Sequence, residues 1–238
     1  MWSSGRSDAA LEAALPVAIE IRRLRSARRM RLRFDDAQGK LKLTCPWRIS
    51  RSSALAWALT QRGWIEAQLA RAEPCEPFRP GAMIPLEGDE VRLVWREDWP
   101  RAPLVHGGEL RCGGPQAAVP QRIEAFLKRR ARETLSGDIA EFAAAAGVTP
   151  RSVVVGDAAT RWGSCSSTGR IRMSWRLILA PIRVRRYVAA HEVAHLVHLN
   201  HGAEFKALEA RLFGPGLSDA RAELRQIGPR LRRIGRGS

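Results

Sequence analysis

The sequence predicts an α+β fold, with helices and a small antiparallel sheet in the C-terminal half and a β-rich region before them. Three observations lead to this prediction. The chain has 238 residues, of which 45% are hydrophobic, and this is enough for a sizeable packed core. Residues 17–47 are predicted to be basic strands, because apolar Met30, Leu32 and Phe34 alternate with Arg29, Arg31 and Arg33. Residues 119–213 alternate long helical stretches with short strand-like runs.

The N-terminal half begins with a polar, alanine-rich stretch, residues 1–16, which we expect to be loosely ordered. The basic strands of residues 17–47 are expected to turn at 35–39, where Asp and Gly are frequent. A serine-rich stretch, 50–53, offers N-caps for one helix over 54–72. Further strands are expected at 83–86, 91–95 and 109–111.

The C-terminal half is expected to begin after Gly113-Gly114-Pro115, the best candidate linker. A long helix over 119–146 should end at Gly147. Short strands then precede a helix that begins after Pro181 and a last helix over 203–213. These strands are expected at 153–155, 161–165 and 171–175. The chain would thus comprise a loose segment (1–16), a basic β-rich region with one helix (17–115), an α+β domain (116–215) and a basic C-terminal tail (216–238).

Four of the five histidines lie in the stretch HEVAHLVHLNH, from 191 to 201. Its H-E-x-x-H motif places His191 and His195 one above the other on a helix, separated by a rise of about 6 Å, so two imidazoles can converge on one ion. Zinc accepts nitrogen ligands at roughly 2.0–2.1 Å and keeps one position open for water in catalytic sites. Glu192 lies beside the first ligand, where a general base is needed. The motif therefore indicates a zinc hydrolase, and first of all a peptidase.

Two histidines are candidates for the third ligand. His198 shares the helix face of His191, but seven residues separate them by about 10.5 Å along the axis, which is too far for one tetrahedral ion. The chain must therefore turn back, and Asn and Gly in Asn200-His201-Gly202 tolerate the left-handed conformation that ends helices. We expect the helix to stop near Leu199 and His201 to complete a three-histidine site. His198 is then expected beside the site or at the surface.

The R-W-G-S-C run at 161–165 allows a functional and a structural interpretation. As a strand beside the metal, Gly163 and Ser164 could pair with an extended peptide through main-chain hydrogen bonds, and Arg161 could orient a carbonyl or carboxylate. In the structural interpretation Gly163 is a bulge, and Trp162 and Trp175 are core residues. We favour the core position for both tryptophans.

These segments resemble the YgjP-like metallopeptidases, which are relatives of the SprT-like zincins. The similarity is dense over residues 150–212, where the R-W-G-S-C run, the W-x-L of Trp175–Leu177, the histidine motif and the N-H-x-x-x-F of Asn200–Phe205 all have counterparts. The resemblance implies a zincin-like metallopeptidase domain. It also implies one Zn²⁺ per chain, with Glu192 as catalytic acid and base and with three ligands, His191, His195 and His201.

The sequence departs from the pattern of this family at three positions. Ser174, Arg186 and Lys206 stand where the family often has Asn, Asp and Trp. None of the three is a proposed ligand. They therefore bear on substrate preference and not on metal binding.

The formal charge of +16 and the pI of about 11.3 raise the question of a nucleic-acid partner. The cationic residues concentrate at 22–33 and at 221–236. Arginines on a solvated strand face are the alternative that we favour, and no aromatic side chain interleaves these arginines, so stacking on bases is not indicated. A basic face that binds nucleic acid stays open.

The cysteines and the hydropathy of the sequence indicate where in the cell the protein is expected. The four cysteines show no C-x-x-C spacing and are expected to be free thiols. Cys165 is disfavoured as a nucleophile, because the histidines are better used on metal, and as a fourth zinc ligand, because it would close the site. No apolar run reaches 18 residues and no secretory signal is recognisable, so we expect a cytoplasmic protein without a membrane partner.

The function that we predict is hydrolysis of peptide or protein substrates by a zinc-bound water and a glutamate base. Two alternatives remain open. The first is a non-catalytic, metal-stabilised module associated with nucleic acid. The second is a peptidase that acts on nucleic-acid-bound proteins. Salt-dependent nucleic-acid binding would distinguish both from a plain peptidase.

Overall fold

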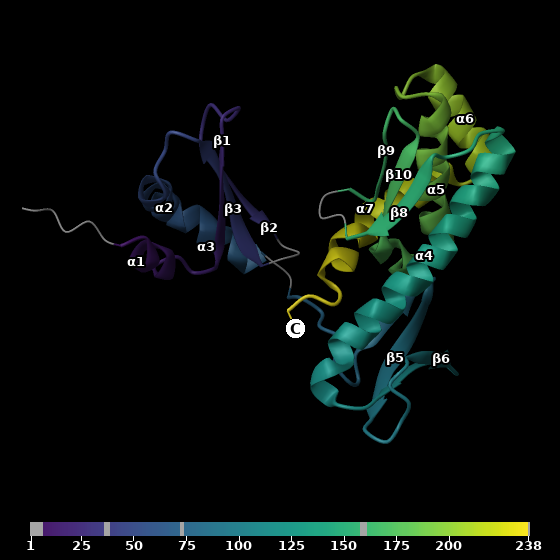
Figure 1. Ribbon diagram of the computed structural model, residues 1–238, viewed down its shortest axis with the longest axis horizontal. Coiled ribbons are helices and arrows are strands. Elements are labelled where there is room, and N and C mark those ends of the chain that lie inside the picture. The colour runs from purple at the N-terminus through teal and green to yellow at the C-terminus, as the bar shows by residue number, and fades with distance from the viewer. Residues whose placement is uncertain (1–6, 36–38, 72–73, 158–160, 238) are drawn as a thin grey trace, which may run out of the picture. The chain divides into compact units, whose positions relative to one another are not determined.

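The computed structural model describes residues 7–35, 39–71, 74–157 and 161–237, and it confirms the α+β class (Figure 1). The chain forms two compact units, essentially Met1–Cys75 and Glu76–Arg236. Each unit has its own hydrophobic core. This division differs from the predicted linker at 113–115, because the strands before that linker share one core with the helix after it.

The first unit is a three-stranded sheet with helices on one face. Its elements are α1 (Asp8–Ala13), β1 (Ile19–Leu24), β2 (Arg31–Asp35), β3 (Lys40–Pro46), α2 (Arg51–Thr60) and α3 (Arg62–Arg71). The central strand β3 runs parallel to β1 and antiparallel to β2. Leu41 and Leu43 of β3 are fully buried with Leu55 of α2 and Ile65 of α3. These contacts build a small core on one side of the sheet only.

Two predictions for the first unit differ from the structure. The segment 1–16 was expected to be loose, and its residues 1–6 lie outside the described residues. In the part 7–16, however, Ser7 caps α1 by accepting a hydrogen bond from the Ala10 amide, and Leu15 is buried. The single helix expected over 54–72 is two helices, with Ser50 as the N-cap of the first and Gln61 at the break. Residues 36–38 of the expected turn lie outside the described residues.

The second unit begins with a four-stranded sheet that packs on a long helix. The strands are β4 (Met83–Leu86), β5 (Asp89–Arg96), β6 (Leu104–His106) and β7 (Glu109–Gly113), in the order β4-β5-β7-β6. The helix α4 (Val119–Ala146) runs without a break through Gly137 and ends at Gly147, whose φ of 68° is left-handed. Leu93 and Leu110 of the sheet are buried in the same cluster as Ile123 of α4. The predicted strand 83–86 and helix 119–146 are confirmed.

A second, smaller sheet lies on the other part of α4. It contains β8 (Ser152–Gly156), β9 (Gly163–Cys165) and β10 (Arg170–Ser174), in the order β8-β10-β9. A tight turn joins β9 to β10, so this pair is antiparallel. Strand β8 runs parallel to β10. The expected antiparallel sheet is therefore mixed. Trp175, directly after β10, is fully buried as predicted.

Three helices complete the unit: α5 (Ile182–Val197), α6 (Ala203–Phe213) and α7 (Leu217–Arg233). The region expected as a basic tail is thus mostly the helix α7. Its Ala220, Leu224 and Leu231 are buried in the main core, which explains why this arginine-rich segment is folded. None of the helices in the described part of the chain is long and apolar enough to cross a membrane.

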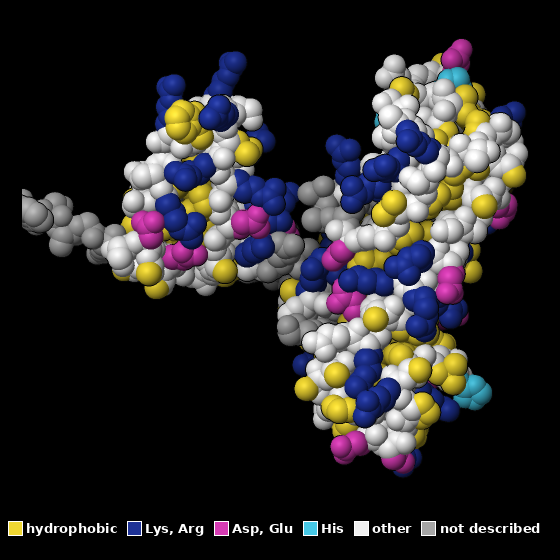
Figure 2. Space-filling model, in the orientation of Figure 1, with side chains coloured by type: hydrophobic (Ala, Val, Ile, Leu, Met, Phe, Trp, Pro, Cys, Tyr) yellow, Lys and Arg dark blue, Asp and Glu magenta, His cyan; other side chains and the backbone are white. Residues whose placement is uncertain are grey.

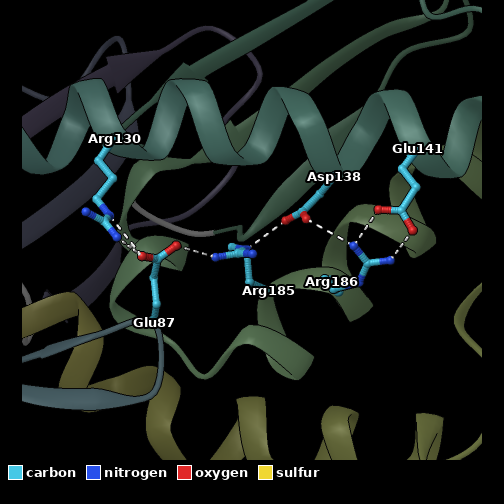
Figure 3. A network of polar contacts seen from close by, with 6 residues as sticks. All are labelled: Glu87, Arg130, Asp138, Glu141, Arg185 and Arg186. Atoms are coloured by element: carbon cyan, nitrogen blue, oxygen red, sulfur yellow. Dashed lines mark hydrogen bonds and ion pairs between the residues drawn. The ribbon is translucent and has the colours of Figure 1, made fainter.

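An ion-pair network anchors α5, the helix of the histidine motif, to α4 (Figure 3). Its members are Glu87, Arg130, Asp138, Glu141, Arg185 and Arg186. Buried Arg185 donates to Asp138 (2.7 Å) and to Glu87 (2.8 Å), and Arg186 pairs with Asp138 and Glu141. Arg186, one of the departures from the family pattern, therefore pairs with carboxylates of α4. Breaking a buried pair typically costs about 3–5 kcal/mol, so the network holds the motif helix firmly in place.

Candidate metal centre

Helix α5 carries two of the predicted ligands on one face. Val184, Val188 and Ala189 in its N-terminal half are buried, and they pack the helix into the core. This packing presents His191 and His195 together, with ring centroids 4.8 Å apart. The i, i+4 spacing therefore brings the two imidazole rings close together on one side of the helix.

The chain after α5 returns and brings His201 to the same place. The imidazole of His201 lies 5.2 Å from that of His191 and 4.6 Å from that of His195. One ring nitrogen from each histidine lies within 4.8 Å of the other two. Three nitrogens gathered this closely are a donor set that suits a metal ion such as zinc.

The turn that brings His201 inward differs from the predicted one. The helix ends at Val197 rather than near Leu199, and His198 is extended, with φ of −127°. Gly202 has φ of −71° and is the N-cap of α6, and Asn200 has no positive φ either. The chain therefore reverses through a bend at Leu199 and Asn200, between extended His198 and extended Gly202, and not through a left-handed helix end.

Each helix-borne histidine has its Nδ1 atom held by a hydrogen bond. His191 Nδ1 lies 2.7 Å from Oε1 of Glu209, and His195 Nδ1 lies 3.1 Å from the carbonyl oxygen of His198. If the Nδ1 hydrogens are donated in these bonds, the Nε2 lone pairs are free for a metal. Burial also lowers the pKa of His195, which favours the neutral form that binds metals.

His198 contributes to the site through its backbone. Its imidazole is not part of the cluster, and its Nδ1 lies 3.6 Å from the exposed carboxylate of Glu204. The expectation that His198 lies beside the site therefore agrees with its position, but the contact with His195 comes from the carbonyl group and not from the side chain.

Glu209 extends the site to the C-terminal helix. Its carboxylate is buried and accepts a hydrogen bond from Arg221 of α7 (2.9 Å), and Arg221 also donates to the hydroxyl of Tyr187 (3.0 Å). Burial raises the pKa of Glu209, but the hydrogen bond from His191 and the charge of Arg221 outweigh it, so that the pKa lies below its ordinary value. Glu209 is thus an ionised carboxylate that orients His191.

These residues were missed by sequence reasoning. Glu209 is eight residues beyond His201, and Arg221 belongs to the segment expected to be a tail. The sequence did contain a signal for Glu209. This glutamate shares one face of α6 with Phe205 and Leu208, and a glutamate on an apolar helix face needs a polar partner. The ring centroid of Phe205 lies 4.5–5.1 Å from the ring centroids of the three histidines, so Phe205 packs against the whole cluster.

Glu192 is buried beside the histidines, with 4% of its surface exposed. Its Oε2 atom has no hydrogen-bond partner among the described residues. Burial raises the pKa of Glu192 to about 7, while the charges of His191 and Arg161 act in the opposite direction. A carboxylate with this pKa is well matched to proton transfer near neutral pH.

Gly163 is required at its position by the approach of Glu192. A Cβ atom on Gly163 would lie 2.4 Å from Oε1 of Glu192 and 2.6 Å from its Cγ. The glycine therefore allows close packing of β9 on α5, and this explains the residue better than the predicted bulge does.

Replacing Gly163 by Ala should displace the carboxylate of Glu192 and lower the hydrolytic activity expected of this site. A misplacement of about 1 Å in a catalytic group can cost on the order of 100-fold in rate. Metal content should be unchanged, because no ligand is touched. The matched control is Gly156→Ala in β8, where an added Cβ meets nothing within 4 Å. If Gly163→Ala keeps the activity of Gly156→Ala, the close approach has no catalytic consequence.

Two further predicted site residues, Arg161 and Gly163, line a pocket next to Glu192, whereas Ser164 does not. The pocket has a volume of about 250 Å³ and is lined by Arg161, Trp162, Gly163, Tyr187, Val188, His191, Glu192 and Leu224. Arg161 is exposed at this pocket, and Ser164 lies on β9, the edge strand of its sheet. Trp162 is only partly buried and lies under the guanidinium of Arg232 at 4.5 Å, so its predicted place in the core is only partly correct.

Cys165 does not join the metal cluster, in agreement with the expectation that it is not a ligand. Burial and the neighbouring Glu192 raise the pKa of its thiol, which keeps it protonated and poorly nucleophilic. All four cysteines are free thiols.

An H-E-x-x-H helix with a third histidine from the following turn and a buried glutamate is the arrangement found in zincin metallopeptidases. The model of the YgjP-like metallopeptidase domain matches residues 28–227. The chain therefore belongs to the YgjP-like metallopeptidase family, and the match extends over parts of both compact units.

Other similarities of the chain are weak. A search among curated proteins gives no significant match. Among solved structures, the chain is similar to the crystal structure of the metallopeptidase zymogen of Methanocaldococcus jannaschii jannalysin. The identity is 16% and the TM-score is 0.35, over 39% of this chain and 94% of that chain.

Proposed function

We propose that this metallopeptidase is a zinc enzyme in which His191, His195 and His201 hold one Zn²⁺ and Glu192 is the general base. The observation that carries the proposal is the buried, unpartnered carboxylate oxygen of Glu192 beside three convergent histidine nitrogens. The donor set fits zinc, because three neutral imidazoles leave a fourth position open for water. Glu209 and the carbonyl of His198 hold two of these imidazoles in the required orientation.

The chemistry is divided between the ion and the chain. Zinc, when bound, supplies a Lewis acid that polarises the scissile carbonyl and lowers the pKa of water toward about 7. Glu192 takes a proton from the attacking water at its free Oε2 atom and passes it to the leaving amine. Burial of Glu192 keeps bulk water away from this proton and supports both transfers.

The peptide is expected to bind along β9. This strand is at the edge of its sheet and packs against α5, so its outer side can pair with an extended substrate through main-chain hydrogen bonds. Gly163 and Ser164 would supply these bonds. The neighbouring pocket, with Val188 and Leu224 on its wall, would then receive one substrate side chain, and Arg161 would orient a carbonyl or carboxylate at its rim.

Removal of the metal tests this function directly. Protein treated with a chelator and dialysed should not cleave a peptide library, and activity should return on addition of one equivalent of Zn²⁺ per chain. Metal analysis of the active protein should give one zinc per chain. Cleavage that is equally fast in the metal-free protein would contradict the proposal.

A further inference from the structure

The sheet of the first unit has one face without a helical cover. Its inner face carries Leu41 and Leu43 against α2 and α3. The alternate residues of the same strands form the opposite face, which we name the basic sheet face. Its members are Glu20, Arg22, Leu24, Arg31, Arg33, Asp35, Lys40, Lys42 and Thr44. Five of them are Lys or Arg, and two are acidic.

The acidic residues of the basic sheet face are already shared between cations. Glu20 pairs with both Arg22 and Lys40, and Asp35 pairs with both Lys42 and Arg33. Arg31 has no carboxylate partner among the described residues. The same holds for four exposed arginines at one end of this sheet: Arg25, Arg28, Arg29 and Arg48. The positive charge here is therefore not neutralised within the unit.

An exposed tryptophan lies at the same end of the sheet. Trp47 is 49% exposed, and the guanidinium carbons of Arg25 and Arg48 each lie 5.6 Å from its ring centroid. The backbone amide of Trp47 donates to the carbonyl of Leu24 (3.1 Å), which places the indole beside the end of β1. No aromatic residue stands among the arginines of 22–33 in the sequence, but the fold adds one from outside that segment. Pairing of β1 with β3 brings Trp47 next to them from a distant position in the sequence.

The chemistry of this surface fits single-stranded nucleic acid. An exposed indole offers a stacking platform for a base, and unpaired arginines bind phosphates along a strand. Residues 1–75 contain 14 Lys or Arg against 7 Asp or Glu. In Figure 2, Lys and Arg side chains are frequent on this unit, with hydrophobic side chains exposed between them. The bases of a duplex are stacked on one another and cannot use the indole in this way.

In the second basic region of the sequence, residues 221–236, several arginines do have carboxylate partners. On α7 and after it, Arg221 pairs with Glu209, Arg230 with Glu76 and Glu90, and Arg236 with Asp157. Its charge is largely used inside the second unit. Of the two basic regions of the sequence, the one near Trp47 therefore keeps more of its charge available for a polyanion.

We propose that the basic sheet face, together with Trp47, Arg25 and Arg48, binds single-stranded nucleic acid with little sequence preference. The bases stack on Trp47 and the phosphates contact Arg25, Arg31 and Arg48. All of these residues belong to the first unit, whereas the metal centre belongs to the second.

Fluorescence anisotropy of the full-length protein with a labelled 15-mer of deoxythymidine or uridine tests this proposal. Trp47→Ala should weaken binding by about tenfold or more, as expected when one base can no longer stack. Replacing Arg25, Arg31 and Arg48 by Gln should flatten the dependence of log K on log salt by about 0.7 for each phosphate that an arginine no longer neutralises. Cleavage of a short peptide and the circular dichroism spectrum should stay unchanged in both variants.

The matched controls lie on α3, outside the basic sheet face. Trp64 is 40% exposed there, and Arg62 and Arg71 are exposed arginines of the same helix. Trp64→Ala and the double variant Arg62→Gln, Arg71→Gln should bind as the wild type does. A loss in these controls as large as that in Trp47→Ala would overturn the proposal. So would wild-type affinity in Trp47→Ala, equal affinity for a 15-base-pair duplex, or binding of phosphatidylserine vesicles without binding of the oligonucleotides.

Discussion

Glu192→Gln should lose peptide hydrolysis by about 10²–10⁴-fold, the usual contribution of a general acid or base. The amide keeps the size and shape of the side chain but cannot take a proton from water. Zinc content should be unchanged, because the three histidines remain. Kinetics with a cleavable peptide, together with metal analysis of the same preparation, would measure both properties.

The fold of this variant should be preserved. Burial raises the pKa of Glu192 to about 7, so the metal-free wild type must keep a proton on this group or bury a charge near neutral pH. A neutral amide has no such cost, and the metal-free variant should be at least as stable to heat as the metal-free wild type. Activity at the wild-type level in a clean preparation of Glu192→Gln would remove this residue from the mechanism.

His201→Ala should lose zinc, while His198→Ala should retain it. His201 supplies one of three nitrogens that lie within 4.8 Å of one another, whereas the imidazole of His198 lies outside this cluster. Loss of a residue that only orients a ligand typically costs about 10–100-fold in metal affinity, and loss of a ligand should cost more. Competition with a chromogenic chelator would measure the affinities.

The pair of variants distinguishes the two candidates for the third ligand. In His198→Ala the backbone carbonyl that holds His195 remains, so even the orientation of that ring should persist. Glu209→Gln offers an intermediate case, because it weakens the partner of His191 without removing a nitrogen. Zinc loss in His198→Ala with zinc retained in His201→Ala would exchange the roles of the two histidines.

Sequence alone was sufficient where the signal is local. The helix over 119–146 is as predicted, because Gly147 ends it in a left-handed conformation and its apolar residues repeat at helical spacing. The strand 83–86 and the helix 203–213 are as predicted for similar reasons. The approach of His191 to His195 also follows from a periodicity within one turn of helix.

Sequence reasoning was less successful where a position depends on distant contacts. The break at Gln61 and the end of α5 at Val197 were not predicted, because helix boundaries carry weak local signals. The arginine-rich segment after 216 reads as a tail by composition. It is a helix because Leu224 and Leu231 bury against a core that the segment cannot supply by itself.

The candidate metal ligands, the candidate proton acceptor and the need for a turn before the third histidine could all be predicted from the order of the residues. The contacts that hold these groups became visible only in the fold: Glu209 and Arg221 lie behind His191, and Gly163 lies against Glu192. The tertiary structure also placed Trp47 among the arginines. Candidate ligands can be recognised from residue types a few positions apart in the sequence. The orientation and burial of their side chains depend instead on contacts between segments that are far apart in the chain.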